Sequence, residues 1–191
     1  MELLRNVLKA IKEHPDRTND IIDSFSDNQY NAKKTLIDML NDNDIIDKTT
    51  DVVIMGSWYG SILVPLLHPI VNSIYLVDLD DNVIRIAKNI FFKDWPNMDY
   101  TTRDVFSKPL EADLFINTSC EHMPPLNTLP WKMSGYFAIQ SNNMHGIDGH
   151  INCVNSIDEF KSQLPKNALI IDEEEIEDTR GTRFTLIGEL C

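Results

Sequence analysis

The chain has 191 residues, of which 42% are hydrophobic and 25% charged, a composition typical of a globular protein with one core. Its formal net charge of −13 disfavours nucleic acid as a partner, because neutralising phosphates requires clustered Lys and Arg. The sequence has no apolar run that could span a bilayer, and its start, MELLRNVLKAIKEH, lacks a signal-peptide core, so we expect a cytoplasmic protein without membrane contact.

Residues 1–50 are predicted to form a helical extension within the same domain as the rest of the chain. Apolar residues recur at helical spacing in 2–13 and 18–24, and a further helix is predicted over 28–40. Gln29 and Lys33 lie one turn apart on this third helix. We interpret them as part of a solvated face; contact with a bound ligand is the alternative.

Residues 51–81 have the pattern of a βαβ unit. A buried strand at 52–55 leads into the loop GSWYG, which is followed by a helix at 61–69 and a second buried strand at 74–77 that ends at Asp78. A glycine after the first strand lets a ligand approach the backbone, and an acidic residue about 20 positions later can bind two ribose hydroxyls. This unit therefore predicts a nucleoside site.

The rest of the chain continues the alternation of helices and strands. We expect a helix capped by Asp80, strands at 98–102, 113–117 and 134–140, a helix at 156–164, and an antiparallel pair at 168–171 and 182–190. Residues 141–149 are predicted as a polar loop and DEEEIED (172–178) as a solvated strand end and turn.

This alternation predicts an α/β fold with a mostly parallel sheet covered on both faces. Ligands of such sheets bind beyond the carboxyl ends of the strands, so the residues that follow the strands are expected to cluster at one edge. These residues are Gly56, Asp78, Asp104, Asn117 and Ser141.

Three segments resemble motifs of the class I S-adenosylmethionine-dependent methyltransferases. VDLDDNVIRIAK (77–88) and RDVF (103–106) resemble cofactor motifs, and ADLFINTSCEHM (112–123) is similar to the family's fourth strand and its polar loop. The resemblance implies a Rossmann-like three-layer sandwich: a mostly parallel seven-stranded sheet with an antiparallel C-terminal strand, preceded by N-terminal helices. It also implies S-adenosylmethionine as cofactor, with 1–50 as an N-terminal extension and 51–191 as the methyltransferase domain.

The resemblance implies roles for individual residues. Asp78 would hold the ribose hydroxyls and Leu79 would flank the adenine, while Asp104 would contact the adenine amino group and Val105 would offer the ring a backbone donor. Asn117 and Thr118 would border the methionine part. The implied cofactor-binding residues are Gly56, Ser57, Trp58, Tyr59, Gly60, Asp78, Leu79, Asp104, Val105, Asn117, Thr118 and Ser119.

The glycine loop departs from the family pattern. That pattern has two or three glycines at alternate positions, whereas here Gly56 and Gly60 enclose Trp58 and Tyr59. The aromatic pair is predicted either to line a pocket or to pack in the core. The path of the loop stays open at this point.

Candidate catalytic residues follow from the reaction that the resemblance implies. Methyl transfer is an in-line displacement at a sulfonium methyl, so the protein positions donor and acceptor and removes a proton from a weakly acidic acceptor. His122 is a candidate base, and Glu121 could orient it or bind a cationic acceptor; local hydrogen bonding is the alternative. The substrate-binding candidates are Asn142, Asn143 and His145, with ordinary turn chemistry as the alternative reading.

No metal site is expected from the sequence. The spacing of His145, Asp148 and His150 places them on no common face, and the three cysteines (Cys120, Cys153 and Cys191) lack the paired spacing of a zinc site or a disulfide framework. Reduced thiols are the expected state.

The leading hypothesis is methyl transfer to a small-molecule or protein acceptor. The alternative is a domain that only binds a nucleoside or a partner protein. An NAD(P)-dependent oxidoreductase is disfavoured, because GSWYGS lacks the G-x-G-x-x-G fingerprint. The sequence names neither the acceptor nor the oligomeric state.

Overall fold

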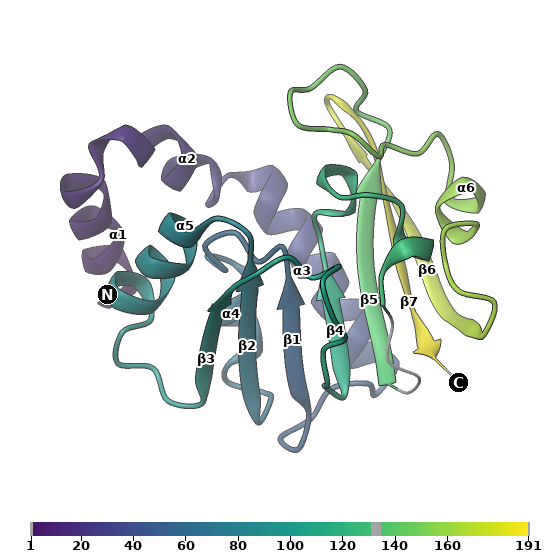
Figure 1. The fold of residues 1–191 in the computed structure, drawn as a ribbon, viewed down its shortest axis with the longest axis horizontal. Coiled ribbons are helices and arrows are strands. Elements are labelled where there is room, and N and C mark those ends of the chain that lie inside the picture. Colours follow the sequence, from purple (N-terminus) through teal and green to yellow (C-terminus); the bar gives the residue numbers. More distant parts are fainter. Residues whose placement is uncertain (1, 131–134, 191) are drawn as a thin grey trace.

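The computed structural model describes residues 2–130 and 135–190 (Figure 1). The helices are α1 (Glu2–Glu13), α2 (Thr18–Asp23), α3 (Asp27–Asp42), α4 (Leu63–Leu67), α5 (Asp81–Ile86), which continues as a π-helical turn (Ala87–Phe91), and α6 (Ile157–Lys161). The strands are β1 (Asp51–Met55), β2 (Ser73–Asp78), β3 (Met98–Thr102), β4 (Leu114–Asn117), β5 (Gly135–Asn142), β6 (Ala168–Asp178) and β7 (Gly181–Leu190).

The described strands form one seven-stranded sheet in the order β3-β2-β1-β4-β5-β7-β6. Neighbouring strands from β3 to β5 pair in parallel, and β7 is inserted antiparallel between β5 and β6. This topology confirms the predicted Rossmann-like fold with its antiparallel C-terminal strand. The parallel strands all end at the same edge, which Figure 1 shows beneath the N-terminal helices and the long loops.

Both faces of the sheet are covered. Side chains alternate between the two faces along each strand, so apolar residues of one strand pack on both sides. On β1, Val52 and Ile54 face the core shared with α3, α4 and α5, while Val53 and Met55 face the segment between β3 and β5. Leu36 of α3 is fully buried in the first of these cores. Burial of one such side chain contributes about 1.5–3 kcal/mol, so the N-terminal helices are held to the sheet by packing.

Two sequence predictions about strands β5 and β6 are wrong. The segment 172–178, expected as a strand end and turn, lies within β6, which pairs with β7 as far as Asp178 opposite Gly181. Its acidic side chains lie on an edge strand, where charge discourages pairing with another sheet edge. Ser141 and Asn142, expected in a loop, are the fully buried end of β5, because that strand continues to pair with β7.

Other differences are small. Helices α4 and α6 are shorter than the predicted 61–69 and 156–164. Ser134, the predicted start of the fifth strand, lies outside the described residues, as does Cys191. Cys120 and Cys153 are free thiols. Among the helices that the structure describes, none is long and apolar enough to cross a membrane.

Candidate functional site

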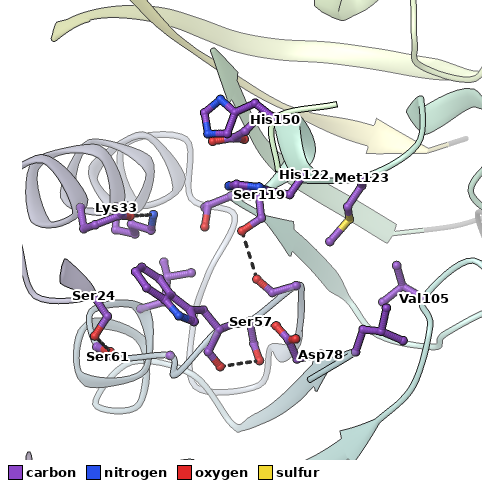
Figure 2. Close-up of a pocket in the computed structure, with 18 of the residues that line it drawn as sticks. Ser24, Lys33, Ser57, Ser61, Asp78, Val105, Ser119, His122, Met123 and His150 are labelled. Carbon is purple, nitrogen blue, oxygen red and sulfur yellow. Dashed lines mark hydrogen bonds between the residues drawn. The ribbon is translucent and has the colours of Figure 1, made fainter. Parts of the chain in front are cut away.

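A cavity of about 750 Å³ lies at the edge where the parallel strands end. The loops after β1, β2, β3, β4 and β5 line it, together with the turn between β6 and β7 and the N-terminal helices. In Figure 2, Ser57 and Asp78 lie on one side of this cavity, opposite His122 and His150. The clustering that the sequence predicts for Gly56, Asp78 and Asp104 is therefore present.

The loop after β1 has left-handed backbone at three alternate residues, with φ of 59° at Gly56, 48° at Trp58 and 66° at Gly60. Trp58 thus occupies a position that favours glycine, and the loop follows the path of a sequence with glycines at alternate positions. A non-glycine residue in this conformation costs about 1–3 kcal/mol. The loop is closed by hydrogen bonds from the Ser57 amide to the Val77 carbonyl (3.1 Å) and from the Gly60 amide to the Ser57 carbonyl (2.9 Å).

Asp78 binds this loop directly. Its Oδ2 accepts a hydrogen bond from the Trp58 amide (2.8 Å), and its Oδ1 accepts one from the Asp80 amide (2.9 Å). The helix cap is Asp80, whose Oδ1 accepts from the amides of Asn82 (2.8 Å) and Val83 (3.4 Å), as predicted. Each carboxylate oxygen has two acceptor sites, so Asp78 keeps acceptor capacity for a ligand in the cavity.

The residues predicted to surround an adenine lie at the same side of the cavity. Leu79 lines the cavity with 73% of its surface exposed, an unusual exposure for a large apolar side chain. Asp104 and Val105 line it from the loop after β3. Oδ1 of Asp104 accepts from the Phe106 amide (2.8 Å), which shapes this loop.

Some residues of the segment after β4 line the cavity, and others are buried beneath it. Thr118 and Ser119 line the cavity, whereas Asn117 is fully buried beneath them. Oδ1 of Asn117 accepts from the Ser119 amide (3.0 Å), and Ser119 Oγ donates to the Gly56 carbonyl (3.2 Å). Ser119 therefore joins the segment after β4 to the loop after β1, while the side chain of Asn117 binds within its own segment and does not line the cavity.

The two aromatic residues of the loop after β1 also differ in position. Trp58 lines the cavity, while Tyr59 is fully buried in the core and does not reach it. Both side chains bind one carboxylate of α2: Trp58 Nε1 donates to Asp20 Oδ1 (3.1 Å) and the Tyr59 hydroxyl donates to Asp20 Oδ2 (2.6 Å). Burial, reinforced by Asp20, raises the pKa of Tyr59, so the phenol stays protonated.

The N-terminal helices contribute further to this wall. Arg17 forms an ion pair with Asp20 (3.0 Å) and another with Asp80, so one guanidinium joins α2 to the cap of α5. Ser24 and Ser61 share a hydrogen bond of 2.7 Å. Asp20 was not predicted from the sequence, because it belongs to no motif and acts only through contacts made on folding.

The opposite side of the cavity holds a buried charged cluster. Glu121 is 4% exposed, and its Oε1 accepts from Asn142 Nδ2 (2.6 Å) and lies 3.5 Å from Nη1 of Arg183. Oε2 of Glu121 has no hydrogen-bond partner in the described structure. Its described side-chain partners are thus Asn142 and Arg183, not His122.

Lys33 lies close to this cluster. Lys33 and Gln29, interpreted from the sequence as a solvated face with ligand contact as the alternative, are both half-buried and line the cavity, which favours the alternative. Burial, together with repulsion from Arg183, lowers the pKa of Lys33 to about 7, and Glu121 opposes this shift. The sequence did not indicate this environment, because Arg183 belongs to the last strand, 150 positions away in the chain.

His122 and His150 face one another with ring centroids 4.6 Å apart and an interplanar angle of 89°. Nδ1 of His122 lies 3.0 Å from the Gly149 carbonyl, and Nδ1 of His150 lies 3.1 Å from the Met144 carbonyl. A carbonyl only accepts, so each Nδ1 carries the proton and donates. In a neutral ring, the lone pair is then on Nε2.

The loop after β5 reaches the cavity through residues other than those expected. Asn142 binds Glu121, Asn143 Oδ1 accepts from the Thr182 amide (2.7 Å), and His145 Nε2 lies 3.0 Å from Asn155 Oδ1. These contacts hold the three candidates outside the cavity lining. Met144, Ile147 and His150 line the cavity in their place.

Comparison with known proteins shows what this fold resembles. No protein-family model matches the sequence, and no curated protein sequence matches it either. Among solved structures, the chain is similar to the N-methyltransferase NodS from Bradyrhizobium japonicum WM9 in complex with S-adenosyl-L-homocysteine. The TM-score is 0.67 at 10% identity, covering 87% of this chain and 89% of NodS.

Two further structures resemble the chain. Magnesium protoporphyrin IX methyltransferase (ChlM) from Synechocystis PCC 6803 with bound SAM has a TM-score of 0.64 and 13% identity, covering 85% of this chain and 79% of ChlM. A SAM-dependent methyltransferase from Aquifex aeolicus has a TM-score of 0.60 and 16% identity, covering 81% of this chain and 89% of that one. At these identities the likeness establishes the fold, which is the fold of solved SAM-dependent methyltransferases.

Proposed function

We propose that the protein is an S-adenosylmethionine-dependent methyltransferase. The observation that supports the proposal is the hydrogen bond from the Trp58 amide to Asp78, by which the carboxylate that we propose as the ribose ligand lies against a loop with left-handed backbone at alternate residues. Structural neighbours of the same fold are solved with S-adenosylmethionine or S-adenosylhomocysteine bound.

In this proposal the cofactor lies along the edge of β1 and β2. Asp78 accepts hydrogen bonds from both ribose hydroxyls, and the adenine lies between Leu79 and Val105 with its amino group toward Asp104. The methionine part then extends along Gly56 and the loop after β4. The ribose contact uses the remaining acceptor capacity of Asp78. The adenine contact covers the exposed apolar side chain of Leu79.

The acceptor enters from the side of Lys33, His122 and Arg183. An in-line displacement breaks the sulfur–methyl bond and forms a bond to the acceptor, and the acceptor's proton passes to a base such as Nε2 of His122. Arg183, together with Lys33 when it is protonated, puts positive charge in this part of an otherwise acidic protein, which favours a small molecule or a protein side chain that carries an anionic group.

Calorimetric titration with S-adenosylmethionine, S-adenosylhomocysteine and reduced nicotinamide dinucleotide tests the cofactor. We expect saturable binding of the first two and none of the third. If the protein binds neither S-adenosylmethionine nor S-adenosylhomocysteine, the proposal is wrong.

Turnover separates an enzyme from a domain that only binds a nucleoside. Purified protein with S-adenosylmethionine and a small-molecule extract should release S-adenosylhomocysteine faster than either alone. Tight binding without release in any extract or protein pool would support the binding domain instead.

A further inference from the structure

We propose that Glu121, His122 and His150 form a site for a divalent transition-metal ion. Each residue offers one ligand atom, and these three atoms, all from the part of the chain that the structure describes, lie within 4.8 Å of one another. Two imidazole nitrogens and one carboxylate oxygen are ligands that suit zinc and its first-row neighbours. The site rests on these side chains alone and does not depend on methyl transfer.

The histidines are already oriented for coordination. Each donates its Nδ1 proton to a backbone carbonyl, His122 to Gly149 and His150 to Met144, so that Nε2 carries the free lone pair. A bond from the second ring nitrogen to a carbonyl is the usual support of a metal-bound histidine, since it selects the tautomer and fixes the ring. The two rings, whose residues are labelled in Figure 2, are perpendicular to one another, and both residues line the cavity.

Glu121 supplies the second independent observation. Its side chain is 5% exposed, and Oε2 lies buried without a hydrogen-bond partner in the described structure. Leaving an acceptor buried and unpaired costs about 1–3 kcal/mol, and more when the group is charged. Asn142 and Arg183 hold the other oxygen, so the carboxylate is fixed with one oxygen available to a cation.

The ligands come from two loops. Glu121 and His122 follow β4, and His150 lies in the loop between β5 and α6. Ligand atoms about 2.0–2.2 Å from a tetrahedral metal lie roughly 3.5 Å apart, so the present spacing of at most 4.8 Å would contract slightly on binding. Three protein ligands leave an open position, as in metal sites that bind a further ligand.

The open position favours an anionic oxygen ligand. Arg183 lines the same part of the cavity and adds positive charge beside the cation. A carboxylate, phosphate or hydroxide on the metal would offset that charge. Only the identity of the ligand at the open position rests on the proposed function: if the methyl acceptor binds here, it binds through such an oxygen. His122 would then be a ligand and not a base, because coordination uses its lone pair.

The test is titration of untagged, chelator-treated protein with Co²⁺ and Zn²⁺, followed by calorimetry and by the visible absorption of bound Co²⁺. We expect one saturable site per chain, weakened more than about 10-fold in His150→Ala and in Glu121→Gln. His145→Ala is the matched control, since His145 lies on the same loop and binds Asn155 outside the cluster. It should bind both metals as the wild type does.

Circular dichroism and S-adenosylhomocysteine affinity establish that each variant is folded. Absence of a saturable site in the wild type overturns the proposal, and so does equal loss in His145→Ala and His150→Ala. Because cofactor binding is measured separately, failure of the metal site and failure of the proposed function give different results.

Discussion

The hydroxyl of Tyr59 donates a 2.6 Å hydrogen bond to Asp20, which lies 39 residues earlier in the chain. The same carboxylate accepts from the indole of Trp58 (3.1 Å). The aromatic pair that departs from the expected glycine pattern is therefore the part of the loop that binds the N-terminal extension. This relationship makes helix α2 a wall of the cavity.

Removal of that carboxylate should destabilise the fold. Asp20→Ala leaves the fully buried Tyr59 hydroxyl without its acceptor, and a buried unpaired polar group costs about 1–3 kcal/mol. Urea unfolding followed by fluorescence should show a decrease in the free energy of unfolding of that size. Asp16→Ala, at an exposed position one turn earlier, is the control and should change it by less than about 0.5 kcal/mol. Equal effects of the two substitutions would contradict this account.

The left-handed backbone at Trp58 should reverse the usual order of stability between alanine and glycine. Alanine is normally more stable than glycine in regular structure by about 0.5–1 kcal/mol. At φ of 48°, glycine is unstrained and alanine is not, so Trp58→Gly should be more stable than Trp58→Ala by about 1 kcal/mol. Both variants lose the indole, so the comparison isolates the backbone. A more stable alanine variant in urea unfolding would show that the loop takes another path.

Lys33 should make stability depend on pH. Burial beside Arg183 lowers its pKa to about 7 in the folded protein, from a usual value of 10.5. Between these values the unfolded chain binds one more proton at this site, so stability rises with pH; below about 6 both states are protonated and the contribution is constant. The advantage of the wild type over Lys33→Met should therefore increase from pH 7 to pH 10. Urea unfolding at pH 6, 8 and 9.5 measures it, and a difference independent of pH would refute the shift.

Residues close in sequence were the predictable ones. Asp78 and the loop at Gly56 follow from two apolar strands and their spacing, because a βαβ unit brings both strand ends to one edge. Asp20 and Arg183 were missed, since they lie outside every motif and reach the cavity only through the packing of α2 and the pairing of β7 with β5. Asn142 was expected to face a substrate and instead turns inward to Glu121.

The same limit applies to the glycine loop. The letters of GSWYG do not reveal that Trp58 adopts the conformation of the missing glycine, because that depends on bonds from Trp58 to Asp78 and Asp20. Long-range partners therefore determine the part of the site that the sequence left open.

The central claim is that the cavity binds S-adenosylmethionine through Asp78. Calorimetric titration with S-adenosylhomocysteine tests it most directly, on the wild type, on Asp78→Ala and on Asp99→Ala, a control at an exposed position of β3 that does not line this cavity. We expect saturable binding by the wild type and by Asp99→Ala, and an affinity at least about 10-fold lower for Asp78→Ala with an unchanged circular dichroism spectrum. No binding by the wild type, or equal binding by all three proteins, would contradict it.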